Sequence, residues 1–173
     1  MRRLILMRHA KSSWADPGKA DIDRPLNERG RRSAPLVAAW LRDRGYRVDA
    51  ALISSSARTQ ETWALAAPAL GYAVPSVMPA LYHAGIAEML EALRTAPDVE
   101  TVLMLGHMPV IGDLARLLVM TAPEDPDFDR YPTAATAVLE FDVADWADVG
   151  PGTGHLAAFA VPRALKVTDG NGA

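Results

Sequence analysis

The sequence predicts an α/β fold, a three-layer α/β/α sandwich around a mostly parallel central sheet. Two observations lead to this prediction: short apolar runs recur along the chain, and segments with a helical spacing of apolar residues lie between them. Strands that alternate with helices form parallel sheets with helices on both faces. The chain has 173 residues without an internal repeat or linker, so we expect residues 1–173 to form a single domain.

Five apolar runs are expected to be the strands of this sheet. They are short and bounded by polar or turn-forming residues, a pattern typical of buried strands. The runs are residues 4–7, 50–53, 101–105, 137–141 and 155–161.

Four segments are expected to be helices, and the longest comprises residues 26–44. Apolar residues between Ala34 and Leu41 repeat there at helical spacing, and Gly45 follows as a stop signal. The other three are residues 59–70, 86–94 and 110–120.

Two segments are expected to be irregular. Residues 121–132 contain three prolines and four acidic residues, a composition that predicts a loop. A frayed tail is expected at residues 168–173.

The composition is that of an ordinary globular protein, with 50% hydrophobic and 23% charged residues. The absence of cysteine excludes disulfides, thiolate catalysis, iron–sulfur clusters and cysteine-ligated zinc. The apolar stretch before Arg8 is shorter than the roughly 7–15 residues of a signal peptide, and no segment approaches the roughly 20 apolar residues of a membrane span. We therefore expect a soluble, cytoplasmic protein.

The net charge of -3 hides two unlike parts of the chain. Residues 1–60 carry 13 lysines and arginines against 6 acidic residues, whereas residues 61–173 carry 5 against 15. Arginine accounts for 15 of the 18 basic residues, and its planar guanidinium group matches the oxygens of phosphate and carboxylate groups in pairs. This asymmetry predicts an anionic partner for the first part of the chain.

Polar residues follow three of the predicted strands at the points where those strands end. They lie at residues 8–12, 54–58 and 106–109. In a sheet of this kind, ligands bind outside the carboxyl ends of the strands. Four side chains are therefore expected to meet at one edge of the sheet: Arg8, His9, Arg58 and His107.

Two histidines and two arginines at one edge suit phosphoryl transfer. A neutral imidazole is a nucleophile toward phosphorus, and covalent catalysis divides one difficult displacement into two easier ones. Arginines supply fixed positive charge and paired donors for the oxygens of a transferring phosphoryl group. Pro109 stands where a helix would begin, so the amides beyond His107 are expected to direct a helix N-terminus at the anion.

Four motifs resemble, in the same order, those of the histidine phosphatase superfamily, which includes cofactor-dependent phosphoglycerate mutase. Residues 6–12 (LMRHAKS) resemble its Arg-His-Gly signature, and residues 24–30 (RPLNERG) its Pro-Leu-Thr-x-x-Gly element. Residues 54–62 (SSSARTQET) resemble its Ser-Ser-Pro-x-x-Arg-x-x-Gln-Thr element, and Gly106-His107 its second histidine. The resemblance covers most of the chain from residue 4 to about residue 120.

The short length, the Arg-His-Ala-Lys-Ser variant and residues 81–84 (LYHA) look most like the small SixA-type phosphohistidine phosphatases. This resemblance implies a phosphoglycerate mutase-like fold and a phosphatase in which His9 is the nucleophile that becomes phosphorylated. It implies that Arg8, Arg58 and His107 bind and neutralise the phosphoryl group, and that water then hydrolyses phospho-His9 without a metal or other cofactor. The implied partner is a phosphorylated substrate, either a phosphohistidine protein or a small phosphate compound, with neither nucleic acid nor a membrane involved.

The chain departs from the family pattern at three places. Ala10 replaces the usual glycine after the histidine, and alanine tolerates positive φ poorly. Ala15 stands where phosphoglycerate mutases have a phosphate-binding asparagine, which argues against mutase activity. No carboxylate stands near Tyr82 and His83, where mutase-type enzymes place a glutamate general acid.

The missing carboxylate favours phosphohistidine as the substrate. An ester leaves as an alkoxide and gains about 10²–10⁴-fold from a positioned proton donor, whereas a nitrogen of phosphohistidine can be protonated before its bond breaks. The proton donor is left open between His83 and Glu88, of which Glu88 is expected on the solvent side of a helix.

Three other interpretations compete with this one. A small-molecule phosphomonoesterase of the same superfamily would use the same residues, and a phosphate-binding module would hold the anion without turnover. The arginines in and around residues 26–44 would suit nucleic-acid phosphates, although acidic residues among them favour a solvated, salt-bridged face.

The spacing of the four histidines does not indicate a metal site. Trp14 and Trp40 are interpreted as packing residues.

Overall fold

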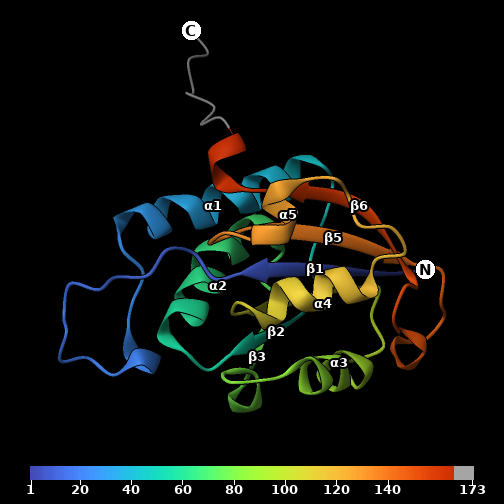
Figure 1. The fold of residues 1–173 in the computed structure, drawn as a ribbon, viewed down its shortest axis with the longest axis horizontal. Coiled ribbons are helices and arrows are strands. Elements are labelled where there is room, and N and C mark those ends of the chain that lie inside the picture. Colours follow the sequence, from blue (N-terminus) through green and yellow to red (C-terminus); the bar gives the residue numbers. More distant parts are fainter. Residues whose placement is uncertain (166–173) are drawn as a thin grey trace, which may run out of the picture.

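The computed structural model describes residues 1–165, and the tail expected at residues 168–173 lies outside the described residues. A six-stranded sheet lies between two layers of helices (Figure 1). In chain order the strands are β1 (Arg2–Arg8), β2 (Ala50–Ser54), β3 (Pro75–Met78), β4 (Thr101–Gly106), β5 (Thr136–Phe141) and β6 (Gly154–Ala160). Their order in the sheet is β3-β2-β4-β1-β5-β6.

All the strands except β5 run in the same direction. β1 pairs in parallel with β4, and β2 pairs in parallel with both β3 and β4. β5 and β6 continue the sheet in antiparallel pairing beyond β1. The predicted three-layer architecture with a mostly parallel sheet is therefore confirmed, and the carboxyl ends of β1, β2 and β4 meet at one edge.

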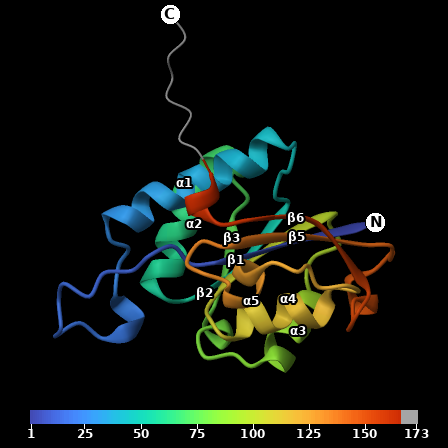
Figure 2. The ribbon, with the colours of Figure 1, turned by 45° about the horizontal axis from the view of Figure 1, so that its top comes forward.

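Helices cover both faces of the sheet (Figure 2). α1 (Glu28–Asp43) and α2 (Ala57–Leu70) lie on one face, and α3 (Ile86–Arg94), α4 (Val110–Leu118) and α5 (Pro126–Arg130) lie on the other. In β1, Ile5 and Met7 pack in the core with α1 and α2, whereas Leu4 and Leu6 pack in the core with α3 and α4. Burial on both faces explains why β1 is a continuous apolar run.

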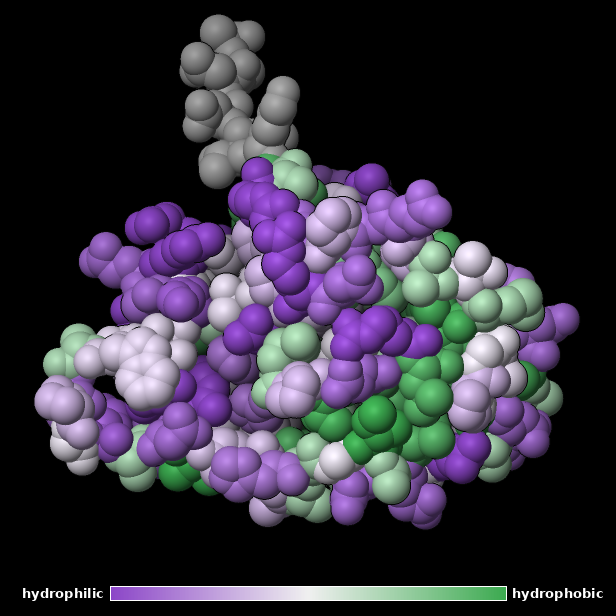
Figure 3. All heavy atoms as spheres, in the orientation of Figure 1, coloured by the Kyte–Doolittle hydropathy of each residue, from purple (hydrophilic) through white to green (hydrophobic). Residues whose placement is uncertain are grey.

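Short 3-10 turns lie between the main elements: η1 (Asp21–Asp23), η2 (Pro79–Leu81), η3 (Trp146–Asp148) and η4 (Pro162–Ala164). The face seen in Figure 3 is hydrophilic over much of its area and hydrophobic over α3 and α4. Within residues 1–165, every helix is too short or too polar to cross a membrane.

Two elements differ from the sequence predictions. β3 has no matching apolar run, because it lies at the sheet edge with Ser76 and Val77 exposed. The loop predicted at residues 121–132 contains α5, so that prediction is wrong for this segment. The side chain of Asp125 accepts a hydrogen bond from the amide of Asp127, and Pro126 occupies the first turn, two features that favour a helix start.

The arginines of α1 are partly paired with acidic side chains. Arg31 Nε lies 2.9 Å from Glu61 Oε1, and Arg42 Nη2 lies 2.8 Å from Asp43 Oδ1. These contacts agree with the salt-bridged face that the sequence favours over a nucleic-acid surface.

Candidate active site

His9 follows β1 directly, and its side chain is buried. Its Nδ1 lies 2.7 Å from the carbonyl oxygen of Ala10. A carbonyl oxygen only accepts, so Nδ1 carries the proton and Nε2 keeps its lone pair. Burial lowers the pKa of His9 to about 3, and the nearby charges of His107, Arg58 and Arg8 act in the same direction. His9 is therefore neutral at pH 7, the form that a nucleophile needs.

Ala10 occupies the place of the family's glycine without backbone strain. Among residues 1–165, the non-glycine residues with positive φ are Tyr72, Tyr131 and Ala134, so Ala10 has an ordinary φ. Its amide donates to Thr62 Oγ1 at 3.1 Å, and this hydroxyl donates in turn to the backbone oxygen of Arg58 at 2.7 Å. These bonds tie the segment after β1 to the first turns of α2.

Arg58 and His107 arrive from two other segments of the chain. Arg58 lies in the first turn of α2, and His107 follows β4. The Nη2 atom of Arg58 lies 3.4 Å from His107 Nδ1, and the ring centroids of His9 and His107 are 5.3 Å apart. The structure thus brings these predicted site residues together, as the parallel sheet requires.

His107 is held by Ser54 at the end of β2. His107 Nε2 lies 2.8 Å from Ser54 Oγ. A guanidinium group only donates, so His107 Nδ1 accepts from Arg58 and His107 Nε2 donates to Ser54. Burial and the charge of Arg58 lower the pKa of His107 to about 4. His107 is neutral at pH 7 in the absence of an anion.

Arg8, the last residue of β1, is the fourth predicted residue of the site. Its Nη1 donates to the backbone oxygen of Tyr131 at 3.0 Å. Burial and the charge of Arg58 lower the pKa of Arg8. Within the described residues, the Nε atoms of Arg8 and Arg58 are buried without a hydrogen-bond partner. Unpaired donors on neighbouring buried cations are costly, and a bound anion would offset that cost.

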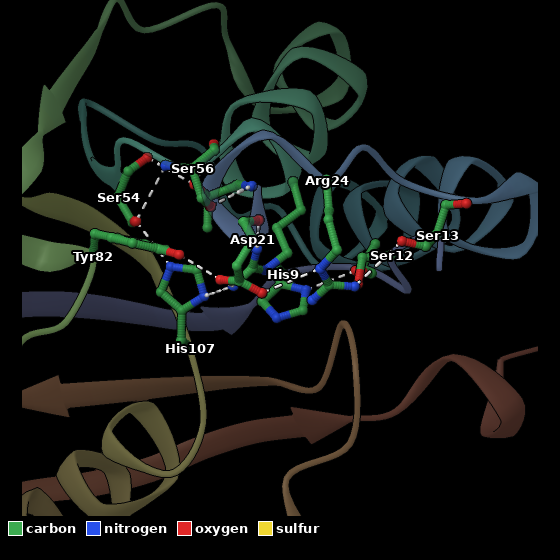
Figure 4. A network of polar contacts seen from close by, with 12 residues as sticks. His9, Ser12, Ser13, Asp21, Arg24, Ser54, Ser56, Tyr82 and His107 are labelled. Atoms are coloured by element: carbon green, nitrogen blue, oxygen red, sulfur yellow. Dashed lines mark hydrogen bonds and ion pairs between the residues drawn. The ribbon is translucent and has the colours of Figure 1, made fainter. Parts of the chain in front are cut away.

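The loop between β1 and α1 supplies Asp21, a residue that the sequence did not indicate for the site. The backbone oxygen of Asp21 accepts from Arg58 Nη1 at 2.8 Å, and its Oδ2 accepts from Arg58 Nη2 at 3.1 Å. Tyr82 donates to the same Oδ2, and Arg24 Nε donates to Oδ1 at 3.1 Å (Figure 4). Hydrogen bonds from Tyr82 and Arg58 hold the pKa of Asp21 well below its usual range. The only feature of the sequence that could have indicated Asp21 is its position three residues before Arg24, the first residue of the second motif.

Arg24 lies beside this network and is buried against Ser12 and Trp14. Its Nη1 donates to Ser12 Oγ at 2.9 Å, and its guanidinium lies 3.5 Å from the centroid of the Trp14 ring. Trp14 itself is 73% exposed, so its interpretation as a packing residue is wrong: it lies on a surface loop and contacts the guanidinium from outside. Trp40 packs against the core formed with α1 and α2, as expected.

A cavity of about 290 Å³ opens next to Arg58 and His107, and both Tyr82 and His83 line it. The side chain of His83 is exposed, and the centroid of its ring lies 4.0 Å from the centroid of the Tyr82 ring. Glu88 does not line this cavity. It is exposed on α3, as expected, and its carboxylate accepts a hydrogen bond from the amide of Gly85 at 3.0 Å.

Pro109 immediately precedes α4, which confirms the predicted helix start. The amide of Ile111 bonds to the backbone oxygen of His107 at 2.9 Å, and Pro109 and Val110 line the same cavity as His107. Among residues 1–165, no three histidine or acidic side chains are grouped to hold a metal ion.

Comparison with known proteins identifies a family for this chain. Residues 4–89 match the family model of the histidine phosphatase superfamily (branch 1). An uncharacterized protein of Mycobacterium tuberculosis is 40% identical over 166 residues, which cover 91% of this chain and all of that protein.

Two solved structures of SixA proteins are similar over nearly their whole length. SixA from Nakamurella multipartitia is 32% identical with a TM-score of 0.79, covering 93% of this chain and 96% of that one. SixA from Agrobacterium tumefaciens is 28% identical with a TM-score of 0.77, covering 93% and 98%. The chain belongs to branch 1 of the histidine phosphatase superfamily and resembles SixA.

Proposed function

We propose that this protein hydrolyses phosphohistidine through a phosphorylated His9. The observation that supports this most strongly is the state of His9: a neutral imidazole with its proton on Nδ1, held by Ala10, and its lone pair on Nε2. Arg8 precedes His9 at the end of β1, and Arg58 and His107 come from two other segments of the chain. Members of this family are typically phosphohydrolases, and the two structural relatives named above are SixA proteins.

In the first step, Nε2 of His9 attacks phosphorus while the bond from phosphorus to the substrate nitrogen breaks. The electron pair of that bond goes to the leaving imidazole. Arg8 and Arg58 bind the phosphoryl oxygens and neutralise their charge. The bound anion also raises the pKa of His107, so His107 takes up a proton and donates to a phosphoryl oxygen.

In the second step, water attacks phosphorus and His9 leaves. The electron pair of the nitrogen–phosphorus bond returns to Nε2, both protons of the water stay with the phosphate product, and neutral His9 is restored. The hydrogen bond from Nδ1 to Ala10 keeps the ring in the same tautomer throughout.

The proton donors available at the site support phosphohistidine over esters. Glu88 caps α3 away from the cavity, which leaves His83 of the two donors that the sequence leaves open, and Asp21 is ionised. Neither carboxyl group is therefore placed and protonated to assist an alkoxide leaving group, which gains about 10²–10⁴-fold from such a donor. A protonated imidazole needs no donor, because it leaves as a neutral ring.

Turnover of a phosphohistidine peptide and of several phosphate monoesters, including para-nitrophenyl phosphate, tests the proposal. We expect a higher kcat/KM for the peptide, and an acid-labile phosphoryl label on the wild-type protein after rapid quenching. His9→Ala should abolish both, whereas His155→Ala, which changes an exposed histidine on β6, should retain both. A strong preference for the esters would instead indicate a small-molecule phosphomonoesterase. Phosphate binding without any turnover would indicate a binding module.

A further inference from the structure

The network around Arg58 includes a carboxylate that the two steps above do not use. We propose that Asp21 sets the preference of the site for a positively charged leaving group, the protonated imidazole of phosphohistidine, over the leaving groups of phosphate esters. This inference rests on the proposed function and deepens it, because it assigns the choice of substrate class to one side chain.

The guanidinium group of Arg58 lies between Asp21 and His107 and contacts both. The Oδ2 atom of Asp21 is 3.1 Å from Arg58 Nη2, and this nitrogen is 3.4 Å from His107 Nδ1. Tyr82, which donates to the same Oδ2, lines the cavity next to His107. Figure 4 shows the Asp21 carboxyl group joined to both Tyr82 and Arg24. Asp21 does not line this cavity itself, but it accepts hydrogen bonds from two residues that do, Arg58 and Tyr82.

The charge on this carboxylate is fixed and is not duplicated nearby. The hydrogen bonds from Tyr82 and Arg58 keep the pKa of Asp21 low, so its carboxyl group is ionised at neutral pH. Within the part of the chain that the structure describes, it is the only carboxylate in hydrogen-bond or ion-pair contact with Arg8, His9, Arg58 or His107. Among the described residues, Asp21 thus supplies the one negative charge in direct contact with the positively charged site residues, through its ion pair with Arg58.

The two substrate classes place opposite charges on their leaving groups. In phosphohistidine, protonation of the second ring nitrogen makes the ring a cation. As the phosphorus–nitrogen bond breaks, its electron pair moves onto the ring, which still carries part of the positive charge in the transition state. An ester oxygen instead gains negative charge in its transition state. A fixed carboxylate attracts the first and repels the second, and only such transition-state differences change kcat/KM.

Arg58 and Arg24 both form ion pairs with Asp21 and offset part of its charge, but removal of the carboxylate still makes the site one charge unit more positive. Once substrate is bound, the charge of Arg58 is shared with the phosphoryl oxygens. Arg24 donates through Nε to Asp21 Oδ1 at 3.1 Å, while its Nη1 donates to Ser12 Oγ at 2.9 Å and its guanidinium lies over the Trp14 ring. The carboxylate of Asp21 remains the acidic group beside Tyr82 at the cavity.

A second role of Asp21, the positioning of Arg58, has a different signature. The backbone oxygen and Oδ2 of Asp21 both accept from Arg58. Arg58 binds the phosphoryl group, which all substrates share, so loss of positioning reduces turnover of phosphohistidine and esters by the same factor. The ratio of the two kcat/KM values separates the charge effect from the positioning effect.

The test compares wild type, Asp21→Asn and Asp21→Glu on a phosphohistidine peptide and on para-nitrophenyl phosphate. Asparagine keeps the shape and one acceptor oxygen but removes the charge, whereas glutamate keeps the charge. The matched control is Asp23→Asn, an exposed neighbour in η1 whose side chain makes no hydrogen bond or ion pair within the described residues. Asp21→Asn should lower the ratio of kcat/KM for the peptide to that for the ester by about 10-fold, whereas Asp21→Glu and Asp23→Asn should change it by less than about 3-fold.

The outcomes separate this inference from the proposed function. If the wild-type protein prefers the peptide and Asp21→Asn leaves the ratio unchanged, whether both rates fall equally or neither falls, the inference is overturned and the proposed function stands. If the wild-type protein prefers the ester, the proposed function fails and the inference fails with it. A loss of preference confined to Asp21→Asn supports both.

Discussion

His9 combines burial with a single hydrogen bond, and this combination determines its protonation state. Burial disfavours the imidazolium, and the neighbouring cations Arg58 and Arg8 add to this effect. The bond to Ala10 selects the tautomer. The sequence predicts which residue types meet at the sheet edge, but it does not give the tautomer, because that depends on the path of the backbone after β1.

We predict that His9 and His107 titrate far below free histidine. In NMR titrations of the imidazole Cε1–H signals, their midpoints should lie at about 3 and about 4, against about 6.5 for an unperturbed histidine. The signals are assigned by their loss in His9→Gln and His107→Gln. A midpoint near 6.5 for His9 would contradict the neutral nucleophile.

Ser54 is predicted to act as a positioning residue for His107. Ser54→Ala removes the acceptor of the His107 Nε2 proton, which lies 2.8 Å away. We expect a loss of about 1 kcal/mol, or about fivefold in kcat/KM, because one neutral hydrogen bond contributes about that much. Ser54→Thr should restore most of the activity, and Ser55→Ala is the matched control. Equal activity of Ser54→Ala and wild type would show that His107 does not depend on this bond.

At the scale of elements, α1 meets the segment after β1 at a glycine. A Cβ on Gly30 would lie 2.2 Å from the backbone oxygen of Lys11, a distance that requires the backbone to move. The amide of Asn27 also donates to this oxygen at 3.0 Å, and the Asn27 side chain accepts from the amide of Gly30. The glycine of the second motif therefore has a packing role: it lets α1 approach the chain two residues after His9.

Gly30→Ala is predicted to lower both stability and activity. Overpacking at a backbone contact destabilises by about 1–3 kcal/mol, and the shift of Lys11 would displace His9. Urea denaturation measures the first effect and phosphatase assays the second. Gly18→Ala is the control, because its Cβ would lie 3.5 Å from its nearest contact, Asp16 Oδ1. If the two variants were equally stable, the close approach of α1 would be less rigid than the structure indicates.

The sequence predicts the buried elements of the fold better than the exposed ones. β1 and β4 are apolar on both faces, so their runs stand out from composition alone. β3 is an edge strand with two exposed residues and has no such run. α5 has only five residues, too few to show a helical repeat, although Asp125 and Pro126 mark its start.

At the scale of the whole molecule, the sheet explains which parts of the site are predictable. Strand ends bring Arg8, His9 and His107 to one edge, and the start of α2 adds Arg58. The loop residue Asp21 follows no repeat and contacts residues that are 37 and 61 positions away in the chain. Its place depends on how the loop folds back over the sheet edge, which no local pattern indicates.

The buried neutral histidines should also make the stability of the whole fold depend on pH. The pKa of His9 is about 3 in the folded protein and 6.5 in the unfolded chain. Below pH 6.5 the unfolded chain therefore binds a proton that the folded protein does not. Stability must therefore fall as the pH decreases from 7 toward 3.

At pH 5 the loss of folding free energy due to His9 is about 2 kcal/mol. His107, whose folded pKa of about 4 also lies below 5, adds a similar amount. The ionised Asp21 makes stability depend on pH only at lower pH values, because the pKa of an unperturbed aspartate is 3.8. Urea denaturation at pH 7 and pH 5 measures the effect, and His9→Gln, which binds no proton in either state, should lose about 2 kcal/mol less between these two pH values than wild type. Equal losses in both proteins would mean that His9 takes up its proton in the folded state, and such a protonated His9 would not serve as the nucleophile at pH 5.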